Sequence, residues 1–270
     1  MNFEEFWTRG DVHERVKIAL KEANLLEKKL EIEDLFPLDQ YHARGIAATI
    51  ELADKLNFSK NSTIIDIGCG LGGPARYFSK RFNCNVYGID ITEAFIEIGN
   101  YFNKLTHIDH QVTLLKGDGE NLPYQTEFFD GAVSQHVTMN IEDREQFFNE
   151  AFRVLKKGAI FGFSEHGLGT KGSPIFPLPW ADNEDMSFLK TPEYTKSLLK
   201  KIGFKNIKII STGEKYISGY NSLLKKGQSN EKPTLGIHVI GGDSMLERSK
   251  NSMHSIIENR TYPFEIICNR

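Results

Sequence analysis

The stretch Ile64–Pro74, IIDIGCGLGGP, decides the fold of this chain. It continues a β-branched run that begins at Thr63, and this run is typical of a buried strand. The glycines that follow permit a sharp turn and a close approach of the backbone, and a helix is predicted to begin at Gly73. In an open α/β sheet, a turn of this kind lies at the carboxyl ends of the strands, where ligands bind. The pattern therefore predicts a ligand-binding turn, and a plain strand-to-helix turn is the alternative.

On both sides of this turn, apolar runs alternate with amphipathic stretches. Strands are predicted at residues 63–67, 85–89, 111–115, 129–134, 159–164, 206–210 and 264–268. Helices are predicted at residues 12–30, 42–56, 73–82, 93–105, 141–155, 192–203, 216–226 and 244–258, with a break at 34–40 around Pro37. Alternation of this kind indicates βαβ units. The fold class is therefore α/β, with a doubly wound, mainly parallel, seven-stranded, Rossmann-like sheet.

The chain is expected to form a single domain over residues 1–270. Residues 1–60 would be an amino-terminal helical cap and residues 61–166 the cofactor-binding core. Residues 167–270 would contain a lid loop and the carboxyl-terminal part of the sheet. The loop Gly167–Asn183 is rich in proline and glycine and too long for a tight connection, which is why it is interpreted as a lid.

Composition narrows the function classes. The net charge is −3 and no long basic patch is present, so a nucleic-acid partner is not expected. The three cysteines form no CxxC pair, so neither a zinc site nor a disulfide framework is expected. No apolar run is long enough to span a bilayer, and the first residues do not resemble a signal peptide. A cytoplasmic protein, monomeric or homodimeric and without a membrane partner, is the expectation.

Two acids suggest which ligand the turn binds. Asp90 closes the second predicted strand, where a carboxylate can accept hydrogen bonds from ribose hydroxyls. The glycine pattern also fits NAD, but Asp66 lies just before the first glycine, and its carboxylate would repel a pyrophosphate. S-adenosylmethionine (SAM) has no phosphate and carries a sulfonium and an ammonium. SAM is therefore favoured as the cofactor, with S-adenosylhomocysteine as its product.

The motif DIGCGLGGPAR at residues 66–76 resembles motif I of class I SAM-dependent methyltransferases. Its ending GGPAR resembles the small-molecule enzymes of the sarcosine/dimethylglycine, ubiquinone-type and sterol groups. The similarity continues through YGIDIT and GDGENLPYQTEFFD, and it covers roughly Asp39 to Phe204. It implies a methyltransferase fold and SAM-dependent methyl transfer, but it does not specify the substrate.

The resemblance also implies a set of cofactor contacts. The methionine part of SAM would lie near the turn, the ribose and adenine near the ends of the second and third strands, and a segment before motif I would fold over them. The residues implied are Asp66, Gly68, Gly70 and Gly72 for the methionine part; Asp90 and Ile91 for the ribose and adenine; Asp118 and Gly119 for the adenine; Gln135 for the methionine or methyl; and Gln40 and Tyr41 for the lid. Asp118 could instead be a turn-forming residue before glycine. Tyr41 and His42 could instead be helix-start residues.

Methyl transfer from a sulfonium is an in-line displacement, so alignment and exclusion of water can supply most of the catalysis. A base is needed only if the acceptor must lose a proton. His136, after the fourth strand, is the first candidate for this catalytic role, and the alternative is a histidine hydrogen-bonded to the cap. His42 and His166 lie near the same strand ends. None of the three has metal-ligand spacing, so no metal is expected.

The acceptor is expected to be a small molecule, first of all an amine or amino acid nitrogen. O- or C-methylation of a phenol, quinone or lipid-like acceptor is the alternative. Phe176 and Trp180 could cover a cationic amine or could pin the loop to the core. Arg44 could meet a substrate carboxylate or form a surface ion pair. An NAD-dependent oxidoreductase and a non-catalytic SAM-binding protein are the competing classes.

Overall fold

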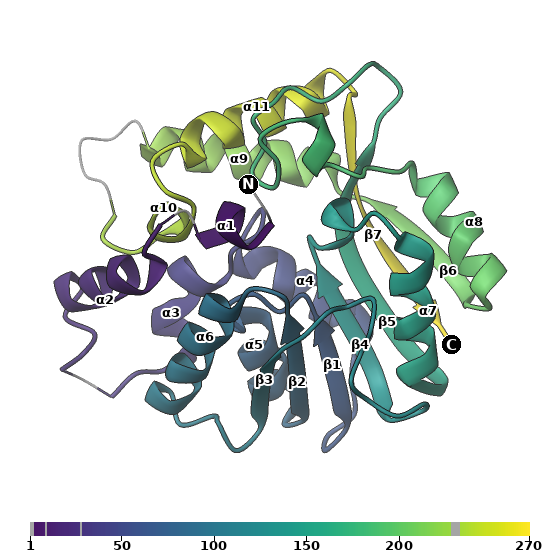
Figure 1. The fold of residues 1–270 in the computed structure, drawn as a ribbon, viewed down its shortest axis with the longest axis horizontal. Coiled ribbons are helices and arrows are strands. Elements are labelled where there is room, and N and C mark those ends of the chain that lie inside the picture. The colour runs from purple at the N-terminus through teal and green to yellow at the C-terminus, as the bar shows by residue number, and fades with distance from the viewer. Residues whose placement is uncertain (1–2, 9, 28, 228–232) are drawn as a thin grey trace.

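The computed structural model describes residues 3–8, 10–27, 29–227 and 233–270 (Figure 1). Its centre is a seven-stranded sheet in the order β3-β2-β1-β4-β5-β7-β6. The strands are β1 (Thr63–Ile67), β2 (Asn85–Asp90), β3 (Val112–Lys116), β4 (Phe129–Gln135), β5 (Leu155–Leu168), β6 (Lys205–Ser211) and β7 (Thr261–Asn269). Strands β1 to β5 pair in parallel, whereas β7 is antiparallel to both β5 and β6. The predicted mainly parallel, doubly wound sheet is confirmed.

Helices cover both faces of the sheet because alternate strand residues point to opposite sides. Ile64 packs in a buried cluster with Leu52, whereas its neighbour Ile65 packs in another with Phe147. The helices are α1 (Phe3–Thr8), α2 (Val12–Glu22), α3 (Ile32–Asp39), α4 (Ile46–Leu56), α5 (Gly73–Phe82), α6 (Glu93–Leu105), α7 (Arg144–Val154), α8 (Pro192–Ile202), α9 (Gly213–Gly227), α10 (Ile237–Gly241) and α11 (Met245–Ile257). Strand order reverses between β1 and β4, which is where open α/β sheets bind ligands.

The cap differs from the sequence prediction. The predicted break at residues 34–40 is wrong, because α3 is a helix that contains Pro37. The helix buries Ile32, Leu35 and Leu38 at helical spacing, and this packing holds it although Pro37 removes one backbone donor. The predicted helix over 12–30 ends at Glu22, and the one predicted over 42–56 begins at Ile46. Residues 40–45 thus lie outside helix, and the end of α3 just before them packs on the first turn of α5.

A helical insertion separates β6 from β7. It comprises α9, α10 and α11, and Figure 1 shows α9 and α11 running side by side above the sheet. Helix α10 contacts α2 and α3, so the insertion meets the amino-terminal cap. This meeting closes a space over the ends of the strands. Within the described residues, no helix has both the length and the apolar composition needed to cross a membrane.

Candidate functional site

The glycine turn links β1 to α5 with one open face. Gly68, Gly70 and Gly72 all have positive φ angles, of 79°, 52° and 76°. A Cβ atom at Gly68 would lie 2.1 Å from the Val137 side chain, so glycine is required there for packing. At Gly70 a Cβ would meet no atom of the described chain within 4 Å. Gly70 is therefore the point at which a ligand can approach the backbone.

Asp90 holds this turn in place. Its Oδ2 accepts a hydrogen bond from the Gly70 amide at 2.8 Å, and its Oδ1 accepts one from the Thr92 amide at 2.9 Å. Each carboxylate oxygen retains a further acceptor site. Ile91, the next residue, leaves 53% of its surface exposed, as an apolar residue that covers a ligand would. The end of β2 thus offers both acceptors and an apolar face.

Asp66 is a buried carboxyl group that lacks a full set of partners. It is 1% exposed, and its Oδ2 has no hydrogen-bond partner among the residues described. Burial raises the pKa of Asp66 to about 8, and the nearby Asp90 carboxylate adds to the effect. A buried acid without a cation is unfavourable, and a positively charged group beside it would lower its pKa. The strand end therefore suits a cationic ligand.

The turn after β3 contains two of the predicted cofactor residues, Asp118 and Gly119, and both make contacts within the protein. Asp118 is exposed, and its Oδ1 accepts a hydrogen bond from the Glu120 amide at 2.9 Å. A Cβ at Gly119 would lie 2.9 Å from the Phe147 ring. Asp118 therefore acts as a turn-forming residue, and its contact with adenine stays a prediction.

Two glutamines lie together over the same region, Gln40 in the cap segment and Gln135 at the end of β4. Thr49 Oγ1 lies 2.7 Å from Gln40 Oε1 and 3.2 Å from Gln135 Oε1, but its one proton can serve only one of them. The side-chain nitrogens of both glutamines are buried without a partner in the described part of the chain. His42 Nε2 lies 3.1 Å from the same hydroxyl. Two amide donors are thus available to a ligand.

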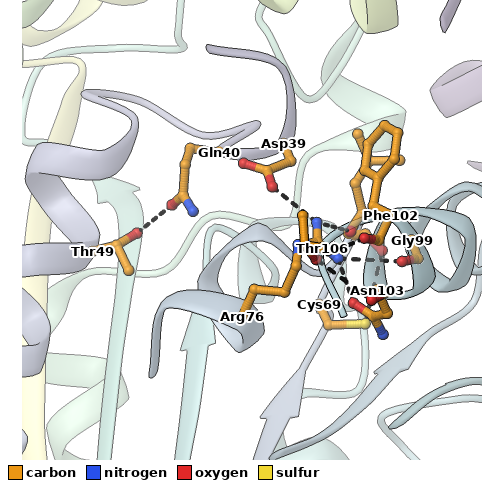
Figure 2. Close-up of polar contacts among 11 residues, drawn as sticks. Asp39, Gln40, Thr49, Cys69, Arg76, Gly99, Phe102, Asn103 and Thr106 are labelled. Carbon is orange, nitrogen blue, oxygen red and sulfur yellow. Dashed lines mark hydrogen bonds and ion pairs between the residues drawn. The ribbon is translucent and has the colours of Figure 1, made fainter. Parts of the chain in front are cut away.

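A buried ion pair fixes this cap segment, and sequence reasoning missed it. Figure 2 shows Arg76 of α5 donating from Nη2 to Asp39 Oδ2 at 2.9 Å and from Nη1 to Asn103 Oδ1 at 2.7 Å. Arg76 is fully buried. A Cβ at Gly73 would lie only 2.3 Å from the Asp39 carbonyl oxygen, so the segment rests directly on the first turn of α5. The GGPAR motif contained Gly73 and Arg76, but only the fold reveals their partner.

Three histidines come together beside the glutamines. The rings of His42 and His136 are parallel, with centroids 5.7 Å apart, and the centroid of His166 lies 5.5 Å from that of His136. His136 Nε2 forms a 2.7 Å hydrogen bond with Tyr216 Oη, and His166 Nε2 lies 3.5 Å from Tyr220 Oη. Both tyrosines come from α9, which the sequence placed outside the site.

Burial keeps these histidines neutral. It lowers the pKa of His42 to about 4 and that of His166 to about 3. The pKa of His136 is also well below its usual value, because burial is reinforced by the positive charge that neighbouring His166, His42 and Arg44 would carry. A neutral imidazole has one donor and one acceptor nitrogen. The cluster is therefore a set of hydrogen-bonding groups rather than a cationic site.

The lowered pKa of His42 predicts a pH-dependent contribution to stability. Below pH 6.5 the unfolded chain gains a proton at this residue that the folded protein does not, so acidification towards pH 4 costs about 1.4 kcal/mol per pH unit. Comparing His42→Asn with the parent by chemical denaturation should therefore show a shallower loss of stability in the variant between pH 6.5 and 5. The same change at exposed His110 is the control. Equal slopes in parent and His42→Asn would show that folded His42 takes up the proton.

A cavity of about 990 Å³ lies between the cap and the insertion. Of the residues predicted from sequence, it is lined by Gln40, Tyr41, His42, Arg44, His136, His166 and Trp180. The rest of its wall includes residues that sequence reasoning missed, from the insertion above all: Glu214, Lys215, Ser218, Gly219, Tyr220, Leu223, Pro233, Leu235, Gly236, Ile237, Met245 and Ser249. The insertion and the cap thus line most of the space that the sequence analysis expected the lid loop to cover.

The two lid-loop aromatics belong to one hydrophobic cluster but line different spaces. Trp180 is 1% exposed, stacks on His166 at 4.5 Å and donates from Nε1 to Ser187 Oγ at 3.0 Å. Phe176 lines a separate groove of about 460 Å³ together with Pro174. The structure therefore places Trp180 in the cavity wall and Phe176 outside it.

Arg44 is engaged within the protein. It forms a two-pronged ion pair with Glu51, which also accepts a hydrogen bond from Lys215 Nζ at 2.7 Å. This arrangement matches the ion-pair alternative for Arg44 rather than a free carboxylate receptor. In the described ranges, no cluster of three or more His, Cys, Asp or Glu residues could hold a metal ion.

Comparisons with known proteins agree with this geometry. Residues 65–163 match the family described as "Methyltransferase domain". The sterol 24-C-methyltransferase of Candida albicans is 33% identical over 114 residues, which is 42% of this chain and 30% of that protein. The chain thus spans less than a third of the length of this relative. These matches confirm the predicted resemblance.

Two further proteins are similar over more of the chain. The sarcosine/dimethylglycine N-methyltransferase of Halorhodospira halochloris is 27% identical over 82% of this chain and 77% of its own length. The structure of Haemonchus contortus phosphoethanolamine N-methyltransferase 2, bound to phosphomonomethylethanolamine and S-adenosylhomocysteine, superimposes with a TM-score of 0.77. It shares 16% identity and covers 100% of this chain and 60% of that chain. At this identity it shows the shared fold.

Proposed function

We propose that this protein, which carries a methyltransferase domain at residues 65–163, transfers the methyl group of SAM to an amine nitrogen of a small-molecule acceptor. The observation that carries the proposal is the buried Asp66 carboxyl oxygen without a partner, next to Asp90 and a glycine turn with an open face. Two acids at the ends of the neighbouring strands β1 and β2 suit a ligand that carries two positive charges, as SAM does.

The residues proposed to bind SAM form a cofactor cradle, and each of them fits one part of SAM. The Asp66 carboxylate would balance its positive charge, and the Gly70 backbone would lie against its methionine part. Asp90 would accept from the ribose hydroxyls with the acceptor sites that Gly70 and Thr92 leave free. The unpaired amide groups of Gln40 and Gln135 would donate to the methionine carboxylate.

The remaining residues proposed to bind the cofactor lie just after the ends of β2 and β3. Ile91 would cover the adenine, with Asp118 and Gly119 at its rim. When bound, SAM would supply an electrophilic methyl carbon on a cationic sulfur; the acceptor nitrogen would take the methyl group, the C–S electron pair would stay with sulfur, and the extra proton on nitrogen would pass to solvent. The histidines would align the acceptor in the cavity and limit its access to water.

Neutral histidines favour nitrogen over oxygen as the acceptor atom. The low pKa of His136 makes its imidazole a weak base, poorly suited to removing a hydroxyl proton. An amine that leaves its proton to solvent on entering the buried cavity needs no base there, because burial favours its neutral form and the free lone pair attacks directly. An imidazole acceptor nitrogen can take a hydrogen bond from the amine N–H and orient the lone pair. His136, which lines the cavity and is fixed by Tyr216, is the residue proposed for this role.

Cofactor binding is expected to release a proton from Asp66. With a pKa of about 8, Asp66 is mostly protonated at pH 7 without ligand, and a cation beside it lowers that pKa. Titration calorimetry of SAM binding in buffers of different ionisation enthalpy should detect a release approaching one proton per SAM. Asp66→Asn should abolish the release and weaken binding. A release of the same size in that variant would contradict the assignment.

Turnover tests the proposed function directly. Purified protein with labelled SAM and a panel of amines, amino acids, phenols and sterol-like lipids should convert SAM to S-adenosylhomocysteine, with amines the best acceptors. SAM, but not NAD, should raise the melting temperature, because only a ligand of the folded state stabilises it. SAM binding without turnover on any acceptor would leave a non-catalytic binding protein, and stabilisation by NAD alone would indicate an oxidoreductase.

A further inference from the structure

We infer that the acceptor is a lipophilic amine, with its nitrogen at the histidine cluster and an extended apolar body in the cavity. The inference rests on the proposed function and goes beyond it by naming the substrate class. It excludes amino acids such as glycine or sarcosine as the preferred acceptors. The size, the lining and the charge balance of the cavity carry it.

The size of the cavity exceeds what a small amino acid needs. At about 990 Å³ it lies at the upper end of the range of roughly 300–1,000 Å³ that encloses drug-sized ligands. In the described chain, Asp66, Asp90, Ile91 and the turn Gly68–Gly72 lie outside its wall. Of the residues proposed to bind the cofactor, only Gln40 and Tyr41 line the cavity, so most of its volume is additional to the cofactor site, and an amino acid would leave much of it empty.

Much of the lining is apolar, and the apolar residues come from several segments. Trp7 and Phe36 come from the cap, Pro179 from the lid loop, and Leu235 and Ile237 from the insertion. Water in such a space would find few hydrogen-bond partners. Covering these surfaces with an apolar ligand body is favourable in proportion to the area removed from water.

The charges of the cavity wall offer little to a zwitterion. The charged side chains that line it are Arg44, Lys215, Glu51 and Glu214, two of each sign. Both cations already share the Glu51 carboxylate, and Glu214 brings the formal charge of the wall to zero. Burial lowers the pKa of His42 and His166, and it raises that of Tyr220 to about 12, so these groups stay neutral near pH 7. Neutral polar groups beside a large apolar wall match an amine head on an apolar body.

A series of alkyl amines tests this inference on the full chain saturated with S-adenosylhomocysteine. Ethyl-, butyl-, hexyl- and octylamine would be titrated by calorimetry, below the concentrations at which they aggregate. Affinity should rise about fourfold per methylene, since burying each CH₂ is favourable by about 0.8 kcal/mol. Glycine and sarcosine should bind no better than ethylamine. A flat series, or tighter binding of glycine or sarcosine than of octylamine, would overturn the inference.

A matched pair of variants ties the effect to the cavity. Leu235→Gln alters the apolar wall and should reduce the gain per methylene, whereas Leu246→Gln changes an exposed residue outside the lining and should retain the parent slope. Equal slopes in both variants would place the amines elsewhere and defeat the inference. If amines were methylated equally well whatever the length of their alkyl chain, the inference would fail while the proposed function stood. If SAM did not bind at all, the proposed function itself would fail.

Discussion

Replacing Asp90 with alanine is expected to weaken SAM binding on the order of 100-fold or more. The proposed ribose contacts are two hydrogen bonds to a carboxylate, and each is worth roughly 1.5–3 kcal/mol. The same change removes the acceptor of the Gly70 amide, at 2.8 Å, and of the Thr92 amide, at 2.9 Å, so the turn also loses its support. Calorimetry with SAM measures the loss, and thermal unfolding without SAM confirms that the variant is folded.

Asp130 provides the matched control for this loss. Its carboxylate also accepts a strand-end amide, from Thr63 at 2.8 Å, but at the opposite end of the sheet. Asp130→Ala should therefore lower stability slightly and leave SAM affinity unchanged. If Asp90→Ala bound SAM as tightly as Asp130→Ala does, the ribose contact would be wrong, and with it the placement of the cofactor.

The second large effect is expected at Arg76. Arg76→Met leaves the Asp39 carboxylate buried without its cation, and breaking a buried pair in this way costs about 3–5 kcal/mol. Burial already raises the pKa of Asp39 against the opposing effect of Arg76, so this acid depends on its partner. Chemical denaturation should show the loss, and a second change, Asp39→Asn, should restore part of it by removing the unpaired charge.

Arg81, on the same helix, is the control for Arg76→Met. It pairs with Asp54 at 2.8 Å, but both side chains are about half exposed. An exposed pair of this kind contributes roughly 0–1 kcal/mol, so Arg81→Met should be close to neutral. Equal losses at the two positions would mean that burial does not decide the strength of the Asp39–Arg76 contact.

The parts of the fold that depend on local signals could be predicted from the sequence. β-branched runs, the glycines of the turn and the acid at the end of β2 are each visible within a few residues, so the sheet and the glycine turn followed. Their proximity also followed, because the carboxyl ends of parallel strands meet at one edge. The roles of the individual site residues stay predictions.

The cavity wall could not be predicted because it is built from distant segments. Tyr216 and Tyr220 are one turn apart on α9, a pattern that also fits a helix packing on the core. Nothing local in the sequence shows that they meet His136 and His166. Likewise, Arg76 is a charged residue that would be placed at the surface by default, and its burial is explained only by partners that the fold brings to it, Asp39 and Asn103 among them.

The position of the helical insertion has a consequence for how acceptor choice can change. Strands β6 and β7 are antiparallel neighbours, so the chain leaves the sheet after β6 and re-enters it at β7 almost at the same place. This place is at the opposite edge of the sheet from β2 and β3. The segment between these strands can therefore change in length or sequence without a change in the strands that hold the glycine turn. In the proposed site, the part of the acceptor wall that the insertion supplies is thus encoded apart from the glycine turn, and it could diverge while the turn is retained.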